Sequence, residues 1–297
     1  AGFVAAGEEF KIVLDVVNRL GALTPNFGRE TTAEAVSISS SLAYPGISGV
    51  PCAVGTVNCT SAPSVSFNNA NFTAVSGVGG RFENTTAKWL QVGSLNINGK
   101  LNDQDYLGSG DTASTNPSAV VGRFYPHHFT LMYATLDDGC AAGNFSYMDS
   151  ASVSSNVLVQ AMAADGSTVL TNYNTGANKA YSGVAAVSVV AENANNAQNL
   201  ASRLETTLPS WVDGSWLWQV ANTDFAKRSD LVPDGPYSNL QLGLAVTSER
   251  DNRNFNVLTM NPATNTDCVA LANCNSVQMG STLDIRYGRF MLENAAG

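Results

Sequence analysis

The chain has little charge and almost no histidine. Only 13% of its 297 residues are charged, and histidine occurs twice, at His127 and His128. Adjacent strand residues point to opposite faces, so these two cannot chelate one metal ion together. A Ser-His-Asp triad also needs a histidine beside its serine, and no Gly-x-Ser-x-Gly motif occurs. The composition therefore argues against a two-histidine metal site and against a serine hydrolase.

Basic residues and long apolar runs are also scarce. Lys and Arg number 15 against 24 Asp and Glu, which gives a net charge of -9. Without a basic stripe to neutralise phosphates, nucleic acid is not an expected partner. No apolar run approaches the roughly 20 residues that cross a bilayer, so we expect no direct membrane insertion. The first residues, 1–8, show neither a basic segment nor an apolar signal core, and we expect a mature or excised segment.

Five cysteines fall into two close pairs and one single residue. Cys52 with Cys59 and Cys268 with Cys274 lie in loops rich in Gly, Asn, Thr and Pro, and neither pair has the spacing of a zinc knuckle. We predict two local disulfides and hence an oxidising compartment. Cys140 is then a buried free thiol or the partner of a cysteine elsewhere in the protein. A fully reduced set of five core cysteines is the alternative.

Alternating apolar and polar residues recur along the chain. The pattern is clear at 10–16, and similar strand-like runs follow at 95–101, 157–163 and 283–287. Period two is typical of strands with one buried face, and turn-rich stretches separate these runs. We predict an all-β fold of tandem immunoglobulin-like antiparallel β-sandwiches.

A repeated tripeptide supports two modules. Gly-Arg-Phe stands at 122–124 and again at 288–290, each time after an alternating run, although a third copy at 80–82 shows that it can arise by chance. Pro126, just after the first copy, disfavours helix and central-strand pairing around it. We therefore predict one β-sandwich module over residues 1–122 and a second over 123–297.

One stretch of the second module departs from the strand pattern. Residues 193–208 are rich in Ala, Asn, Gln, Leu and Glu, and Leu200, Arg203, Leu204 and Leu208 fall at helical spacing. We predict a short helix that ends before Pro209.

Three of the four tryptophans gather directly after this stretch, at Trp211, Trp216 and Trp218. As core residues they would supply much of a module's buried aromatic area, and as an exposed ladder they would form a carbohydrate-stacking platform. We favour the core, because alternation with Leu217 and Val220 suits a strand buried on both faces. Ligand binding by the three rings is the alternative.

Carboxylates in polar turns are candidates for metal binding and for glycoside hydrolysis. Asp103, Asp105 and Asp111 share a polar turn where their hard oxygen ligands could hold calcium, or where they are simply solvated. A glycosidase needs only two acids at a suitable separation. Candidate pairs, all in polar turns, are Asp103 with Asp105, Asp137 with Asp138, and Glu249 with Asp251. No other cofactor is expected.

Several phrases in order resemble a known family. They are Thr24-Pro25-Asn26-Phe27-Gly28-Arg29-Glu30, Asp105-Tyr106-Leu107-Gly108-Ser109-Gly110-Asp111, Val121-Gly122-Arg123-Phe124-Tyr125-Pro126-His127-His128-Phe129, Phe145-Ser146-Tyr147-Met148, Asp234-Gly235-Pro236-Tyr237 and the stretch from Arg286 to Gly297. Together they resemble the large C-terminal region of MshQ-like proteins, which are encoded with the mannose-sensitive haemagglutinin type IV pilus machinery of Gram-negative bacteria. The family pattern carries Asp where His127 stands and Tyr-Gly where Ala296-Gly297 stands. The resemblance implies export, pilus association and adhesion, and it supplies no catalytic residues.

These observations predict a non-enzymatic structural or adhesion module, extracellular or on the outer cell surface, with other pilus or cell-surface proteins as partners. A carbohydrate-binding module or glycoside-active enzyme, with surface glycans as partners, is one alternative. A subunit of an extracellular filament is another.

Overall fold

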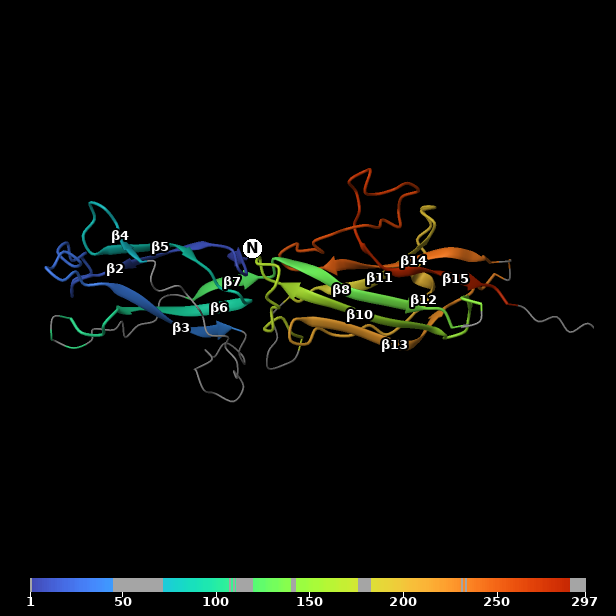
Figure 1. Cartoon of the computed structure of the whole chain (residues 1–297), viewed down its shortest axis with the longest axis horizontal. Coiled ribbons are helices and arrows are strands. Elements are labelled where there is room, and N and C mark those ends of the chain that lie inside the picture. The colour runs from blue at the N-terminus through green and yellow to red at the C-terminus, as the bar shows by residue number, and fades with distance from the viewer. Residues whose placement is uncertain are drawn as a thin grey trace, which may run out of the picture. The chain divides into compact units, whose positions relative to one another are not determined.

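The computed structural model describes residues 2–44, 72–106, 108, 110, 120–139, 143–175, 183–230, 232 and 234–288. Nearly all regular structure in these ranges is β-strand (Figure 1). The strands are β1 (Val4–Ala5), β2 (Phe10–Asp15), β3 (Val36–Tyr44), β4 (Thr73–Ala74), β5 (Arg81–Ala87), β6 (Gly93–Leu101), β7 (Val121–Tyr125), β8 (His128–Asp137), β9 (Ser146–Tyr147), β10 (Val153–Met162), β11 (Ala186–Asn193), β12 (Leu204–Glu205), β13 (Ser215–Phe225), β14 (Tyr237–Ser248) and β15 (Val277–Arg286). The predicted all-β class is confirmed.

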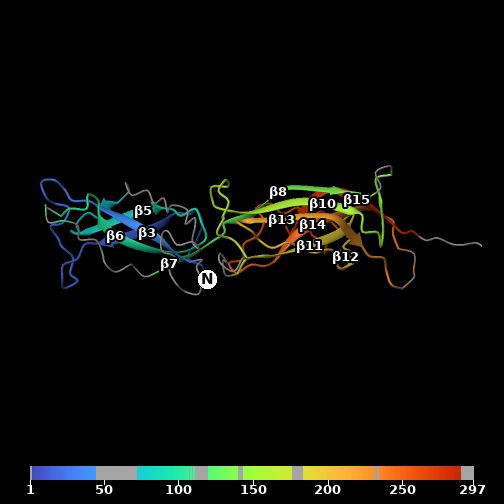
Figure 2. The same cartoon turned by 90° about the horizontal axis from the view of Figure 1, so that it is seen from below.

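The chain divides into two compact units, whose strands can be followed from a second direction in Figure 2. Unit 1 comprises Ala1–His127 together with Ala161–Ser182 and Val212–Gly214. Unit 2 comprises His128–Gln160, Gly183–Trp211 and Ser215–Gly297. Unit 1 therefore includes three stretches beyond the predicted boundary at 122/123, namely 123–127, 161–182 and 212–214.

Unit 1 contains two sheets that share one core. One sheet has the order β1-β7-β6-β3 and the other β2-β5-β4. The alternating side chains of β2 bury Phe10 and Ile12 against Leu95 and Ile97 of β6 and against Phe124 of β7. The rings of Phe10 and Phe124 meet edge to face, with centroids 5.2 Å apart. The period-two pattern at 10–16 thus produces a strand with one buried face, as predicted.

Buried polar contacts tie residues 169–172 to the rest of unit 1. The side-chain oxygen of Gln91 accepts the Asn172 N–H at 3.2 Å, and the Gln91 amide nitrogen donates to the Val169 carbonyl at 3.2 Å. The Asn172 amide donates in turn to the Val92 carbonyl at 3.3 Å. These two amides satisfy backbone groups that would otherwise be costly to bury.

Unit 2 also has two sheets with a common interior. Their orders are β12-β13-β10-β8 and β11-β14-β15-β9. Val157 and Val159 of β10 lie directly opposite Trp218 and Trp216 of β13, respectively. Facing residues of the second sheet are fully buried, among them Leu240, Leu242, Leu244, Met279 and Leu283. Aromatic and branched side chains in cross-strand pairs are the main source of stability in such sheets.

The predicted helix at 193–208 is wrong. The structure has a single 3₁₀ turn over Ala201–Arg203, followed at once by β12. Ala194, Asn195 and Ala197 have φ values of 52°, 52° and 59°, which an α-helix cannot contain. The Asn199 side chain also accepts the Ala201 N–H at 2.9 Å, a local bond that competes with helical pairing. The helical spacing of the leucines did not reveal the positive φ values at Ala194, Asn195 and Ala197.

No helix in the described ranges is long and apolar enough to cross a membrane.

Candidate functional site

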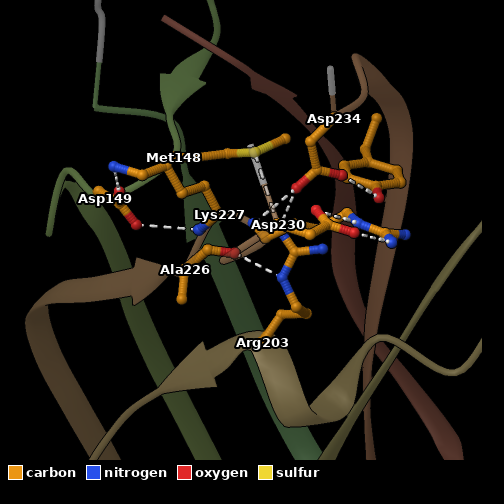
Figure 3. Close-up of polar contacts among 9 residues, drawn as sticks. Met148, Asp149, Arg203, Ala226, Lys227, Asp230 and Asp234 are labelled. Carbon is orange, nitrogen blue, oxygen red and sulfur yellow. Dashed lines mark hydrogen bonds and ion pairs between the residues drawn. The ribbon is translucent and has the colours of Figure 1, made fainter. Parts of the chain in front are cut away.

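Charged side chains gather at one end of unit 2, where β13 ends and β14 begins (Figure 3). Arg203, from the 3₁₀ turn, lies at the centre of this group. Its Nε donates to the Ala226 carbonyl at 2.5 Å, and its Nη2 pairs with the Asp234 carboxylate. The guanidinium also lies 4.8 Å from the centre of the Phe225 ring and 3.9 Å from the Met148 sulfur. The Arg203 side chain thus joins its own turn to three other segments of unit 2, at Met148, at Phe225–Ala226 and at Asp234.

Asp234 is the buried partner in this network. Its carboxylate accepts the Tyr237 hydroxyl at 2.7 Å and the Arg228 N–H at 3.0 Å, in addition to Arg203. Burial alone would raise the pKa of Asp234, but the hydrogen bonds from Arg203 and Tyr237 outweigh it and lower that pKa. Burial and the neighbouring carboxylate raise the pKa of Tyr237. The carboxylate is therefore held ionised and fully engaged, which suits a clamp and not a general acid.

Two more ion pairs lie on the solvent side of this clamp. Lys227 pairs with Asp149, whose carboxylate also accepts the Lys227 N–H at 2.9 Å. The side-chain and backbone hydrogen bonds from Lys227 lower the pKa of Asp149. Arg228 forms a two-pronged contact with Asp230, at 3.1 and 2.5 Å. Most cations at this end of unit 2 are thus matched with a neighbouring carboxylate.

A shallow open hollow of about 500 Å³ borders the clamp. Asp284 and Arg286 form a forked pair in it, with contacts of 3.2 and 2.7 Å. The Arg286 guanidinium lies 4.2 Å from the centre of the Phe145 ring, which fixes its plane. The lining residues are Asp234, Gly235, Pro236, Ser238, Asp284, Arg286 and Tyr287. An oriented fork beside an aromatic ring and a proline can hold a polar ligand such as a sugar or a peptide end.

Asp138 lies close to this hollow. Burial raises the pKa of its carboxyl, and the nearby charge of Asp284 acts in the same direction. The Ser146 hydroxyl oxygen accepts the Gly139 N–H at 2.8 Å and lies 3.5 Å from the Asp138 carboxylate.

Within the described ranges, no three or more His, Cys, Asp or Glu side chains are grouped so as to hold a metal ion.

The structure places the three clustered tryptophans in the interior. Trp211 and Trp216 are 2% exposed and Trp218 is 1% exposed. The alternative in which they form an exposed sugar-stacking platform is therefore wrong, because no ring face reaches solvent. The expectation that their strand is buried on both faces also needs correction, since Leu217 is 42% exposed on the outer face of β13.

The predicted calcium residues lie in the turn after β6. The Asp103 carboxylate accepts the Asp105 N–H at 3.1 Å, and the Asp105 carboxylate accepts the Gly110 N–H at 2.8 Å. Both side chains are exposed and stabilise the turn. Asp111 lies outside the described residues, so calcium binding here stays a prediction.

Of the predicted disulfides, one falls within the described residues. Cys268 and Cys274 are joined by a disulfide bond in the connection between β14 and β15. Cys52, Cys59 and Cys140 lie outside the described residues. An internal disulfide is the bond that an oxidising compartment permits, and it fits an exported protein.

Sequence reasoning missed the clamp. In the sequence, Asp234-Gly235-Pro236-Tyr237 contributes to the family resemblance, and Arg203 to the predicted helix, but nothing links the two. A turn that carries both an acid and a tyrosine, in a chain with few cations, was the available signal. The pairing itself spans 31 residues and follows from no local pattern.

Fold and site thus define a two-unit, all-β protein that carries a disulfide. Its residues 91–275 match the family model described as DUF6701, third domain. This match covers more than half of the chain, which therefore belongs to the DUF6701 family. No curated protein and no solved structure matches the chain at a significant level.

Proposed function

We propose that this chain is a non-enzymatic structural or adhesion module of a pilus-associated or cell-surface bacterial protein, located outside the cell. The observation that supports it most is the use of charge at the end of unit 2. Arg203, Asp234 and Tyr237 hold one another and the strand ends, which leaves no acid and base poised over a reacting group. Such a cluster gives a rigid unit suited to presenting or transmitting a contact.

We further propose that each unit is an immunoglobulin-like β-sandwich. In support, each unit has two sheets whose inner faces share a core, and most strand pairs are antiparallel. The pilus context is supported by the resemblance to MshQ-like proteins, and the extracellular location by the disulfide. Other pilus or surface proteins are the proposed partners.

The test uses the full protein in the bacterium that encodes it. Intact cells are labelled with a membrane-impermeant biotin reagent, and adhesion and pilus number are compared between wild type, a deletion strain and the complemented strain. We expect labelling of the protein and a defect in the deletion strain that complementation reverses. Unlabelled protein, or unchanged adhesion and piliation, would contradict the proposal. Turnover of an oligosaccharide panel by the purified chain would contradict its non-enzymatic character.

The hollow favours a second candidate function, the binding of surface glycans. Its forked Asp284–Arg286 pair and the wall formed by Tyr287 and Pro236 replace the buried tryptophans as the place where a sugar could lie. On a glycan array, a saccharide bound by the wild type should be lost by Asp284→Asn and by Tyr287→Ala. Leu217→Ser, on the outer face of another sheet, is the matched control and should bind normally. An array without a bound glycan rejects this candidate.

A further inference from the structure

The disulfide between Cys268 and Cys274 closes a small ring in the connection between β14 and β15. Inside and beside this ring, the Asn273 N–H donates to the Cys268 carbonyl at 3.0 Å, and the Leu271 N–H donates to the Asp267 carbonyl at 3.3 Å. A covalent closure with these internal hydrogen bonds leaves the backbone little freedom. We call residues 268–274 the disulfide ring.

The base of the disulfide ring is fixed as well. Met260 and Ser276 form an isolated bridge, and the buried Ser276 hydroxyl donates to the Met260 carbonyl at 2.9 Å. The Asn261 side chain donates to the Asn273 carbonyl at 2.7 Å. The orange-to-red connection that carries the ring rises clear of the strands of unit 2 (Figure 1). The disulfide ring is therefore a rigid projection.

This projection displays two aliphatic side chains. Val269 is 61% exposed and Leu271 is 54% exposed, and Asp267 is the sole charged residue from 267 to 275. Exposed aliphatic groups on a preorganised loop are typical of a docking element, because little entropy is lost when it binds. Because Asp267 is acidic, we expect the ring to bind an apolar cleft that also contains a cation.

Unit 1 contains a cleft of that character. It lies beside the edge strand β2 and the end of β6, and its volume is about 350 Å³. Its walls are mainly apolar and include one cation, Lys100. The carboxylate of Asp15 also lines the cleft, but it accepts hydrogen bonds from Arg81 at 2.6 and 2.7 Å. The apolar lining residues are Leu14, Val16, Val17, Val36 and Leu101. We call this the β2/β6 cleft.

We propose that the disulfide ring of one copy of this chain docks into the β2/β6 cleft of a second copy. The two aliphatic side chains fill the apolar cleft, and Asp267 pairs with Lys100. Because the two surfaces differ, the contact is heterologous, and repetition of it builds open chains instead of closed dimers. The inference goes beyond the proposed function, since it holds whatever receptor the module binds.

The area of the contact sets its strength. Two half-exposed aliphatic side chains offer roughly 200 Å², against roughly 800 Å² per partner in a stable complex. The contact is therefore weak between isolated molecules. It becomes effective where many copies are held side by side, as on a cell surface, because each link raises the local concentration for the next.

The test compares a ring variant with a cleft variant. In the ring variant, Val269→Ser with Leu271→Ser removes the two exposed aliphatic side chains, which we call the knob, but leaves the cleft intact. In the cleft variant, Val17→Glu places a negative charge in the cleft, where it repels Asp267. Val13→Glu is the matched control for the cleft, because Val13 is 43% exposed on the neighbouring edge strand β2 but does not line the cleft. Association of the full chain is followed by sedimentation equilibrium from about 10 μM to about 1 mM.

We expect concentration-dependent chains for the wild type and for Val13→Glu, and monomers for the ring and cleft variants. An equal mixture of ring and cleft variants should give dimers and nothing larger, since one intact knob and one intact cleft remain. This complementation also shows that both variants are folded. A wild type that stays monomeric throughout the range overturns the proposal. So does a ring variant that associates like the wild type, or a Val13→Glu variant as defective as Val17→Glu.

Discussion

The clamp around Arg203 makes a quantitative prediction about the stability of unit 2. Arg203→Met keeps most of the side-chain length but removes the cation and its hydrogen bonds. The change leaves the Asp234 carboxylate buried without its main partner, while the Ala226 carbonyl loses a charged donor. A buried charge that loses its partner is strongly destabilising.

The exposures of the two side chains decide the magnitude. Arg203 is 15% exposed and Asp234 2% exposed at the side chain. Removal of one partner from a fully buried pair costs about 3–5 kcal/mol, and the residual access of water to Arg203 places this pair at the lower end, at about 3 kcal/mol. With a urea dependence of about 2 kcal/mol per molar, the midpoint should fall by about 1.5 M.

Tryptophan fluorescence during urea unfolding reports on the right unit. Trp211, Trp216 and Trp218 lie in unit 2, whereas Trp89 lies in unit 1. The matched control is Arg286→Met, which removes the same chemistry from an Arg–Asp fork that is 46% and 23% exposed. Exposed pairs contribute about 0–1 kcal/mol, so the control should change the midpoint little.

The effect of Arg203→Met should also depend on pH. Hydrogen bonds from Arg203 and Tyr237 lower the pKa of Asp234 in the wild type, although burial opposes them. A carboxyl group with a lowered pKa stabilises the fold above its unfolded pKa of about 3.9, and this stability is lost as the pH falls through the folded value. In the variant, Asp234 keeps the hydrogen bonds from Tyr237 and from the Arg228 backbone N–H but loses those of Arg203, so less opposes the effect of burial and protonation relieves the buried charge. The difference between wild type and variant should be largest at neutral pH and shrink below about pH 4.

Two results would refute this reasoning. Equal losses in Arg203→Met and Arg286→Met would mean that burial does not strengthen the clamp. A loss of the same size at pH 7 and pH 3 would mean that the damage is one of packing, not of an uncompensated charge.

Three further predictions concern the core and the disulfide. Trp218→Ala should lower the unfolding free energy by about 3–5 kcal/mol, whereas Leu217→Ala beside it should cost under about 1 kcal/mol, both by urea unfolding. Reduction of the Cys268–Cys274 bond, or the double substitution Cys268→Ser with Cys274→Ser, should lower the unfolding free energy by at most about 2 kcal/mol, because the closed loop is short. Thiol alkylation and mass spectrometry verify the redox state. Glu192 is 1% exposed, neither carboxylate oxygen has a hydrogen-bond partner, and burial raises its pKa. Glu192→Gln should therefore stabilise the chain by about 1–3 kcal/mol at pH 7, and urea unfolding at a series of pH values should show that this gain disappears towards pH 4. A destabilised variant would contradict the burial of an unpaired charge.

The strands were predictable where one face is buried. Phe10 and Ile12 alternate with exposed residues, and the same local pattern identified β10, in which Val157 and Val159 are buried. Alternation depends only on neighbouring residues, and a single sequence contains that information. The same logic failed at β13, since Leu217 is exposed: an apolar residue between two tryptophans does not reveal that its side of the sheet faces water.

The site was not predictable for a different reason. The Arg203 side chain meets partners from the end of β13 and from the turn before β14, and no pattern within either segment requires the other. The helix predicted at 193–208 placed Arg203 at the same helical spacing as its leucines, with no acidic partner. Positive φ values at Ala194, Asn195 and Ala197 and the bond from the Ala201 N–H to the Asn199 side chain override that propensity, and Arg203 lies at the end of a single 3₁₀ turn. Long-range pairing of charges follows from the fold and cannot precede it.

The edges of unit 2 indicate how it can contact other molecules. Just before the edge strand β11, the Ala185 carbonyl accepts the Trp211 indole N–H at 2.9 Å, and within β11 the Ala191 carbonyl accepts the Leu200 N–H at 2.8 Å. In the other sheet β12 pairs with the end of β13, and Pro209, which follows β12, has no N–H to donate to an added strand. Edges closed in this way resist the addition of a foreign strand. Contacts that other molecules make at the β11 and β12 edges must therefore use side chains, whereas β8 and β9 form the remaining edges of the two sheets. The hollow around Arg286 and the disulfide ring offer further side-chain surfaces on unit 2.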